Sequence, residues 1–288
     1  MIVAPVTVGI PTWARGVRVL QTLERIQRCS PQPNEIFVYF DAGDCSLMTE
    51  VRSSFPGVRV LRGSNERIGP GGGRHQCILA TTQPIFVSFD DDSYPVDEDF
   101  FAEAVRLFSV HPEAGVIGAT IWHRNEPAKL RDDIFLRKAD FTGCGHALRV
   151  SAYHETRGYL PRPNAYGMEE TDLSIQLFAK GWKIFQTSEL RVFHDTELTH
   201  HESPEITADT IANVALFAFL HYPLWGWPRG SLQVVNRVVY SLKMRRITGI
   251  FAGLRRIPRV CLNLRRYRAP LPWHVIRGFL DLRKRRAT

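Results

Sequence analysis

The sequence predicts an α/β fold in which helices alternate with the parallel strands of one sheet. Over residues 1–120, short apolar runs rich in Val, Ile or Phe alternate with segments of helical periodicity. This alternation requires right-handed crossovers and therefore parallel strands. A chain of 288 residues with 44% hydrophobic and 23% charged residues buries a core without crosslinks and is neither disordered nor fibrous.

The apolar runs predict the strands of the first half, and the periodic segments predict the helices between them. Each run is bounded by Pro, Gly or Asp, which commonly end a strand. Helices are expected at 17–28, 75–80 and 97–110. The expected strands are 6–10, 35–40, 58–61, 85–90 and 115–122.

After residue 122 the pattern is less regular. Residues 123–141 are polar and predict a long loop or a short helix. An amphipathic helix is expected at 169–180, because its apolar residues share one face and a glycine follows it. From residue 204 the chain is expected to be helical, with breaks at Pro258, Pro270 and Pro272. The remaining expected elements are strands at 143–150, 183–186 and 191–194 and a short helix at 151–157.

Charge divides the chain into two parts. Residues 229–288 carry 16 Lys and Arg and a single acid, Asp281, whereas the preceding residues carry 21 basic and 28 acidic side chains. We therefore expect two domains, a globular α/β domain over 1–203 and a helical, arginine-rich C-terminal extension over 204–288. Such asymmetry indicates a polyanionic partner, either a membrane or a nucleic acid.

Three consecutive carboxylates, Asp90, Asp91 and Asp92, lie at the end of an apolar run. Like charges this close raise one another's pKa unless a cation neutralises them. Carboxylate oxygens suit Mg²⁺ or Mn²⁺, which often bridge to substrate phosphates. A solvated turn that caps a helix is the structural alternative, but the position after a strand favours metal–phosphate binding.

A glycine-rich segment, GPGGGR at residues 69–74, precedes the helix expected at 75–80. Glycines let backbone N–H groups approach a phosphate at a helix N-terminus, and Arg74 has the geometry to pair with one. The segment matches neither the P-loop nor the dinucleotide-binding motif.

Two acids and a histidine complete the candidate site. Glu169 and Glu170 begin the helix expected at 169–180, where they complement the helix dipole or supply a general base. His194 ends a short strand and is a candidate metal ligand, with His200 and His201 following closely.

Taken in order, these segments resemble inverting family 2 glycosyltransferases with the GT-A fold, over roughly residues 5–196. The run 6–10 is followed by Pro11, Thr12 and Arg15, which resemble the family's opening strand and turn. The other matching positions are Asp41 after the second strand, Arg74, the DxD motif at 90–92, the small-residue segment containing Gly143 and Gly145, the acidic helix start at 169–173, and His194.

The resemblance implies a Rossmann-like mixed sheet flanked by helices and a role for each matching residue. Glu170 is the expected base by position, with Glu169 as the alternative. Asp92 and His194 are expected to face the metal. Contacts to the nucleotide sugar are expected from Pro11, Thr12, Arg15, Asp41, Arg74, Asp90, Asp91, Gly143 and Gly145.

The reaction implied by the resemblance moves a sugar from a nucleotide-diphosphate sugar to an acceptor hydroxyl, with Mn²⁺ or Mg²⁺ as the cofactor. The expected acceptor is a glycan, a lipid-linked molecule or a small molecule, as in the synthesis of cell-surface glycans or glycolipids. Two alternatives stay open: a non-catalytic membrane-associated protein of the same fold, and a nucleotidyltransferase.

The C-terminal extension interleaves an apolar stripe with arginines, a composition that suits an anionic membrane surface. Packing of the extension on the α/β domain is the alternative, and we do not expect nucleic acid as a partner. The uncharged stretch 211–227 falls short of the roughly 20 apolar residues that span a bilayer. Scattered cysteines without a CxxC pair indicate a reducing compartment, so we expect a cytoplasmic protein, peripheral at the inner face of the cell membrane.

Overall fold

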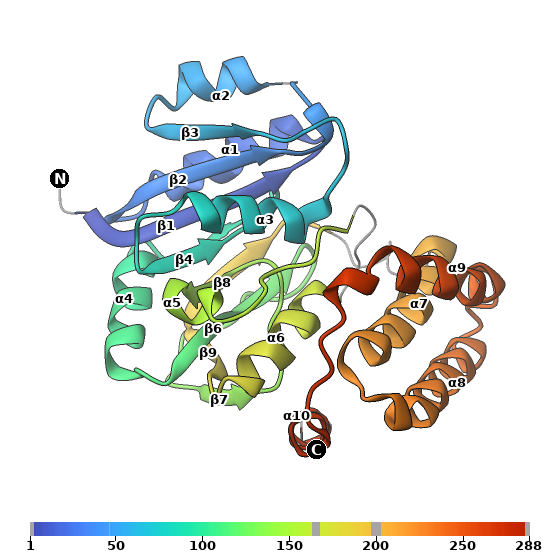
Figure 1. The fold of residues 1–288 in the computed structure, drawn as a ribbon. Coiled ribbons are helices and arrows are strands. Elements are labelled where there is room, and N and C mark those ends of the chain that lie inside the picture. Colours follow the sequence, from blue (N-terminus) through green and yellow to red (C-terminus); the bar gives the residue numbers. More distant parts are fainter. Residues whose placement is uncertain (1–2, 46, 163–167, 197–202, 286–288) are drawn as a thin grey trace.

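The computed structural model describes residues 3–45, 47–162, 168–196 and 203–285, which form a mixed sheet flanked by helices and a helical C-terminal part (Figure 1). The strands are β1 (Val3–Thr12), β2 (Gln32–Phe40), β3 (Val58–Arg62), β4 (Ile85–Ser88), β5 (Ser93–Pro95), β6 (Ala114–His123), β7 (Phe135–Lys138), β8 (His146–Arg149) and β9 (Lys183–His194). Within the described residues they form one sheet in the order β3-β2-β1-β4-β8-β6-β9-β5, with β7 paired to β9.

The first half of the sheet is parallel, as the sequence predicts. β1 pairs in parallel with β2 and with β4, and β2 pairs in parallel with β3. β8 then runs antiparallel to both β4 and β6, so the Rossmann-like mixed sheet is confirmed. The carboxyl ends of β1, β2 and β4 therefore meet at one edge of the sheet, where α/β folds place their ligands.

Helices cover both faces of the sheet (Figure 1). α1 (Gly16–Ile26) and α4 (Phe100–Val110) pack on one face, where Val19, Leu23 and Ile26 are buried at helical spacing. The helices on the opposite face are α3 (Gly69–Ala80), α5 (Val150–His154) and α6 (Glu169–Ala179), and α2 (Met48–Ser54) lies against β3.

Three expectations about local structure were wrong. Residues 69–74 belong to α3 itself and do not form a loop before it. Residues 123–141 contain strand β7, because its Phe135 stacks on Phe185 with ring centroids 4.6 Å apart. Residues 183–194 form the single strand β9, in which Leu190 is fully buried and a shift of register replaces the expected gap.

The C-terminal part is helical from residue 204, as expected. Its helices are α7 (Pro204–His221), α8 (Trp227–Lys243), α9 (Ile250–Asn263) and α10 (Trp273–Lys284). Pro258 lies inside α9 and does not end it, contrary to the expectation. α7 and α10 pack on α6 around the fully buried Ile175, Leu216 and Phe279. Among the described residues, no helix has both the length and the apolar content to cross a membrane.

Candidate active site

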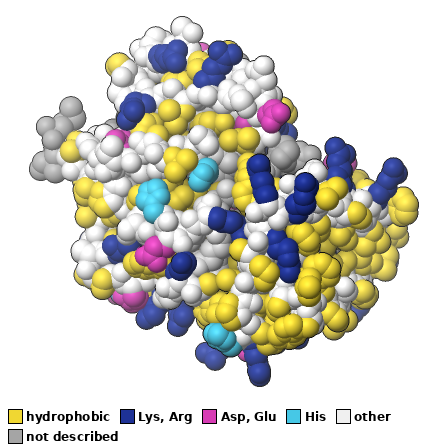
Figure 2. Space-filling view, viewed as in Figure 1, with side chains coloured by type: hydrophobic (Ala, Val, Ile, Leu, Met, Phe, Trp, Pro, Cys, Tyr) yellow, Lys and Arg dark blue, Asp and Glu magenta, His cyan; other side chains and the backbone are white. Residues whose placement is uncertain are grey.

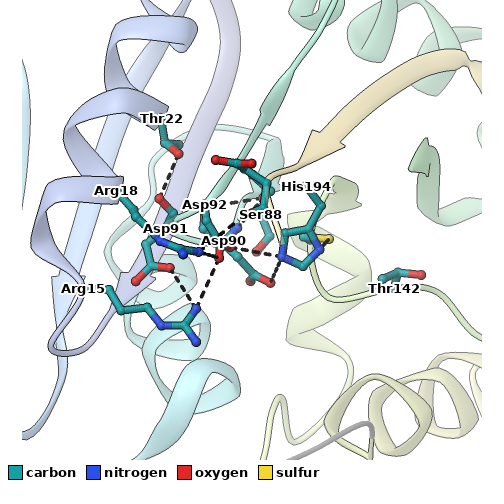
Figure 3. A network of polar contacts seen from close by, with 12 residues as sticks. Arg15, Arg18, Thr22, Ser88, Asp90, Asp91, Asp92, Thr142 and His194 are labelled. Atoms are coloured by element: carbon teal, nitrogen blue, oxygen red, sulfur yellow. Dashed lines mark hydrogen bonds and ion pairs between the residues drawn. The ribbon is translucent and has the colours of Figure 1, made fainter. Parts of the chain in front are cut away.

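The triplet Asp90–Asp92 follows β4 and faces the end of β1 (Figure 3). Thr12, the last residue of β1, donates a hydrogen bond to Asp91 Oδ2 at 2.8 Å. Burial and the neighbouring charge of Asp92 raise the pKa of Asp91 to about 7. The hydrogen bond from Thr12 to Asp91 thus connects the end of β1 to the segment that follows β4. Asp90 and Asp92 contact the other residues of the site.

Asp92 is surrounded by positive groups. Its Oδ2 accepts hydrogen bonds from Arg18 at 2.7 Å and Arg15 at 3.3 Å, and its Oδ1 lies 3.0 Å from His194 Nε2. Burial alone would raise the pKa of Asp92, but His194 and the arginines outweigh burial and lower it. Arg18 was not among the expected residues; it lies in the first turn of α1, three residues after Arg15, which caps that helix.

His194 ends β9 and lies between the acids and Cys144. Its Nε2 is 4.0 Å from Asp90 Oδ2, and its Nδ1 is 3.6 Å from Cys144 Sγ. Burial would lower the pKa of His194, but the hydrogen bonds to Asp92 and Cys144 raise it to about 11. His200 and His201 lie outside the described residues.

Asp90, Cys144 and His194 have ligand atoms that all lie within 4.8 Å of one another, and Asp92 adjoins this cluster. The two carboxylates and the imidazole suit Mn²⁺. Thiolate is a soft ligand that suits Zn²⁺ or Cu⁺ better than Mn²⁺, so Cys144 does not belong to the ligand set expected for a hard cation. The residues present thus fit a divalent cation through Asp90, Asp92 and His194.

Arg74 connects the aspartates to the glutamates. Its guanidinium pairs with Asp90, and its Nη1 lies 3.5 Å from Glu170 Oε1 and 3.6 Å from Glu169 Oε1. Its Nε donates to Ser88 Oγ at 2.9 Å. The Arg74 side chain is only 2% exposed, so this one buried cation faces carboxylates from both motifs.

The N–H groups of the glycine-rich segment bind carboxylates of the protein itself. Asp41 accepts hydrogen bonds from the N–H groups of Ile68 at 3.1 Å and Gly69 at 2.8 Å. Glu169 Oε1 accepts from Gly71 N–H at 3.1 Å. In the structure, the carboxylates of Asp41 and Glu169 therefore occupy the N–H groups of Gly69 and Gly71, which the sequence analysis assigned to a phosphate.

Glu169 and Glu170 have different environments although they are adjacent. The Glu169 side chain is 3% exposed, and its Oε2 is buried without a hydrogen-bond partner. Burial and the charge of Glu170 raise the pKa of Glu169 to about 8. The Glu170 side chain is 13% exposed, and burial raises its pKa while Arg74 opposes the shift. Glu170 is therefore the more accessible acid.

Small residues leave room for these contacts. A Cβ at Gly143 would clash with Glu170 Oε1 and lie 2.9 Å from Arg74 Nη2. Gly145 has φ +68°, and its N–H donates to Ser88 O at 2.7 Å. Pro11 lies close to Gly73, at the edge of the sheet that carries the other expected site residues.

A family model described as Glycosyl transferase family 2 matches residues 7–167, which is more than half of the chain. The chain belongs to this family. No curated protein matches its sequence.

Solved glycosyltransferase structures share the fold of this family 2 glycosyltransferase. GalNAc-T7 with UDP, GalNAc and Mn²⁺ is similar with a TM-score of 0.61 and 14% identity, over 77% of this chain and 49% of that chain. The mannosyltransferase PcManGT from Pyrobaculum calidifontis with GDP-Man and Mn²⁺ has a TM-score of 0.60 and 14% identity, over 99% of this chain and 87% of that chain. S. aureus TarS has a TM-score of 0.57 and 12% identity, over 81% of this chain and 43% of that chain. The chain spans about half or less of the length of GalNAc-T7 and TarS. The fold is GT-A.

The raised pKa of Glu169 predicts how stability depends on pH. The unfolded chain loses this proton near pH 4.5 and the folded chain near pH 8, so Glu169 makes stability fall as pH rises between these values. We expect Glu169→Gln to remove this decline. Between pH 5 and pH 8, the Tm of the variant should fall by roughly 2–5 °C less than the Tm of the wild type. Differential scanning fluorimetry measures it.

Glu24→Gln, on the exposed side of α1, is the matched control and should keep the wild-type decline. An equal decline in Glu169→Gln and the wild type would show that Glu169 is ionised in the folded protein.

Proposed function

We propose that this family 2 glycosyltransferase transfers a sugar from a nucleotide-diphosphate sugar to an acceptor hydroxyl with inversion, using Glu170 as the base. The observation that carries the proposal is Arg74, whose guanidinium pairs with Asp90 and lies 3.5 Å from Glu170. A donor bound at the aspartates would therefore present its sugar to Glu170. The structures of similar fold bind UDP, GDP-Man and UDP-GlcNAc, which supports a nucleotide sugar as the donor.

The donor's diphosphate is proposed to lie between the aspartates and the arginines. Arg15 is 59% exposed and Arg18 is 43% exposed, so both reach solvent beside the buried Asp92. Arginine pairs readily with phosphate oxygens. Further contacts to the nucleotide sugar are proposed from Pro11, Thr12, Asp41, Arg74, Asp90, Asp91, Gly143 and Gly145.

A divalent cation, Mn²⁺ or Mg²⁺, is proposed at Asp90, Asp92 and His194. When bound there, it would stabilise the negative charge that develops on the leaving diphosphate. The structures of GalNAc-T7 and PcManGT contain Mn²⁺, which supports the same class of cofactor.

Glu170 is proposed to accept the proton of the acceptor hydroxyl. The acceptor oxygen forms its bond to the anomeric carbon as the bond from that carbon to the diphosphate oxygen breaks. Burial raises the pKa of Glu170, which makes it a stronger base once it is ionised, and Arg74 stabilises its charged form. Glu169 is held by Gly71 N–H and positions the start of α6.

The cation site predicts a binding defect that needs no knowledge of the donor sugar. Mn²⁺ with UDP or GDP should stabilise the wild type, by about 2.7 kcal/mol at a hundredfold excess over Kd. We expect Asp90→Asn and His194→Ala to lose the Mn²⁺-dependent part because each removes a ligand atom. Thermal shift with and without Mn²⁺ measures this difference.

Asp195→Asn is the matched control, because Asp195 follows His194 but pairs with Arg124 at 2.7 Å. Mn²⁺-dependent stabilisation that survives in both ligand variants would place the cation elsewhere.

The proposed base predicts a defect in transfer alone. Glu170→Gln keeps the shape of the side chain but cannot accept a proton, so transfer should fall about 10²–10⁴-fold. Nucleotide binding with Mn²⁺ should stay near the wild-type level. The transfer rate is measured with the donor that a sugar-nucleotide screen identifies. Nucleotide binding is measured by thermal shift.

The products distinguish the remaining alternatives. A glycosyltransferase releases a nucleoside diphosphate, whereas a nucleotidyltransferase releases inorganic diphosphate and a non-catalytic protein releases neither.

Wild-type turnover by Glu170→Gln would remove Glu170 from the mechanism.

A membrane surface is proposed as a second partner, through α8, α9 and the turns beside them. The exposed Leu232, Val235, Val239 and Leu242 recur every three or four residues and so share one face of α8. Figure 2 shows hydrophobic side chains gathered over the C-terminal helices, with Lys and Arg beside them. A patch of apolar and basic side chains is complementary to anionic lipid, at about 1 kcal/mol per basic residue near the surface.

The patch predicts binding to vesicles that contain phosphatidylglycerol. Ile247 and Phe251 are 65% and 78% exposed, and we expect the double variant Ile247→Ser, Phe251→Ser to sediment less with such vesicles than the wild type. Leu130→Ser, at an 81% exposed position of the α/β part, is the control. Equal sedimentation of all three proteins would exclude the patch as the membrane contact.

A further inference from the structure

A cavity of about 460 Å³ lies outside the aspartate and glutamate cluster, between α6 and the C-terminal helices. Its volume is within the range of small-molecule sites in proteins. α6, α7, α8 and α10 all contribute to its walls, so it exists only because the C-terminal part packs on the α/β part. Its lining includes Thr171 of α6, Thr210 and Phe217 of α7, Gln233 and Arg237 of α8, and Arg283 of α10.

The charged side chains in the described lining of the cavity are basic. Its described lining contains Arg237 and Arg283 and no Asp or Glu. The Nε of Arg237 is buried without a hydrogen-bond partner, and its guanidinium lies 5.2 Å from the centre of the Tyr240 ring. A buried donor without a partner is costly, so an anion in the cavity would supply what Arg237 lacks.

The other polar groups of the lining are amides and hydroxyls. The side-chain oxygen of Gln233 accepts a hydrogen bond from Tyr222, which leaves its NH₂ group as a donor. Thr210 and Asn236 add a hydroxyl and a second amide. Such groups recognise the hydroxyls of a sugar, while Phe217 offers it an apolar wall.

The cavity lies beside the first turn of α6, which carries the proposed base. Thr171 lines it and directly follows Glu170 on α6. Arg283 lies 3.2 Å from Asp140, and Asp140 is close enough to Glu170 for its charge to act on that carboxyl. Through Thr171 and Asp140, the cavity is therefore connected to the segment that carries Glu170.

We propose that this cavity binds the acceptor and that the acceptor is a phosphorylated sugar, with its phosphate at Arg237 and Arg283. The inference rests on the proposed function for its role as acceptor, but not for binding. A free sugar phosphate and the headgroup of a lipid-linked sugar phosphate share this chemistry. Arg237 belongs to α8, and the other face of this helix exposes apolar side chains. The lipid chain of a ligand bound at Arg237 would therefore lie close to a membrane that this face contacts.

The test is a calorimetric titration of the full chain without nucleotide or metal. The probes are glucose 1-phosphate, farnesyl-phosphoglucose in detergent micelles, and methyl glucoside as the neutral sugar. We expect saturable binding of at least one phosphate probe. Arg237→Gln should weaken it roughly tenfold or more, because a charge-assisted hydrogen bond is lost.

Two further variants separate recognition from folding and net charge. Asn236→Asp places a negative charge at an exposed position of the lining and should weaken binding, since it repels phosphate. Arg259→Gln removes the same charge as Arg237→Gln at an exposed position of α9 outside the cavity, and it should bind like the wild type. Tighter binding of the farnesyl probe would indicate a lipid-linked ligand, and equal binding a free one.

The proposal is overturned if neither phosphate probe binds, if methyl glucoside binds as tightly, or if Arg237→Gln and Asn236→Asp bind like Arg259→Gln. Binding of the phosphate probes is measured without donor or metal, whereas the proposed base is tested by transfer, so loss of the cavity proposal and loss of the proposed base are separate results.

Discussion

The site depends on one buried cation among three carboxylates. Arg74 is almost completely buried, pairs with Asp90 and lies within 3.6 Å of both Glu169 and Glu170. Without it, the negative charges of Asp90 and Glu170 would repel each other with no buried cation between them. The glycines of α3 allow this arrangement, since Glu169 packs directly against Gly71. Arg74 therefore fixes the separation between Asp90 and the glutamates at 169 and 170.

Positive and negative groups alternate through the rest of the site. Asp92 lies between Arg18 and His194, at 2.7 Å and 3.0 Å, while Asp90 lies between His194 and Arg74. His194 thus contacts both carboxylates at the position where a divalent cation is proposed. The carboxylates are thus kept in place by protein cations before any ligand binds, which is a form of preorganisation.

The C-terminal helices face the α/β part on one side and solvent on the other. His221 of α7 lies 2.7 Å from the buried Asp172 of α6, which Arg157 also contacts at 2.5 Å, so α7 is tied to the helix that begins with the proposed base. α8 and α9 instead expose apolar side chains such as Leu232 and Phe251 (Figure 2). The two sides of this one unit correspond to the proposed acceptor cavity and the proposed membrane surface.

The sequence alone determined the order of the main elements and the residues that follow each strand, because periodicity and turn residues are local properties. It also indicated family membership through the order of its motifs. The tertiary structure decided that residues 69–74 are helical, that Glu169 rather than Glu170 is enclosed, and that Cys144 adjoins His194. These outcomes depend on contacts between residues far apart in the chain, such as Arg74 and Glu170, which are 96 positions apart. Local sequence does not specify which side chains are buried or which charged residues become neighbours. The packing of the sheet, α6 and the C-terminal helices determines both.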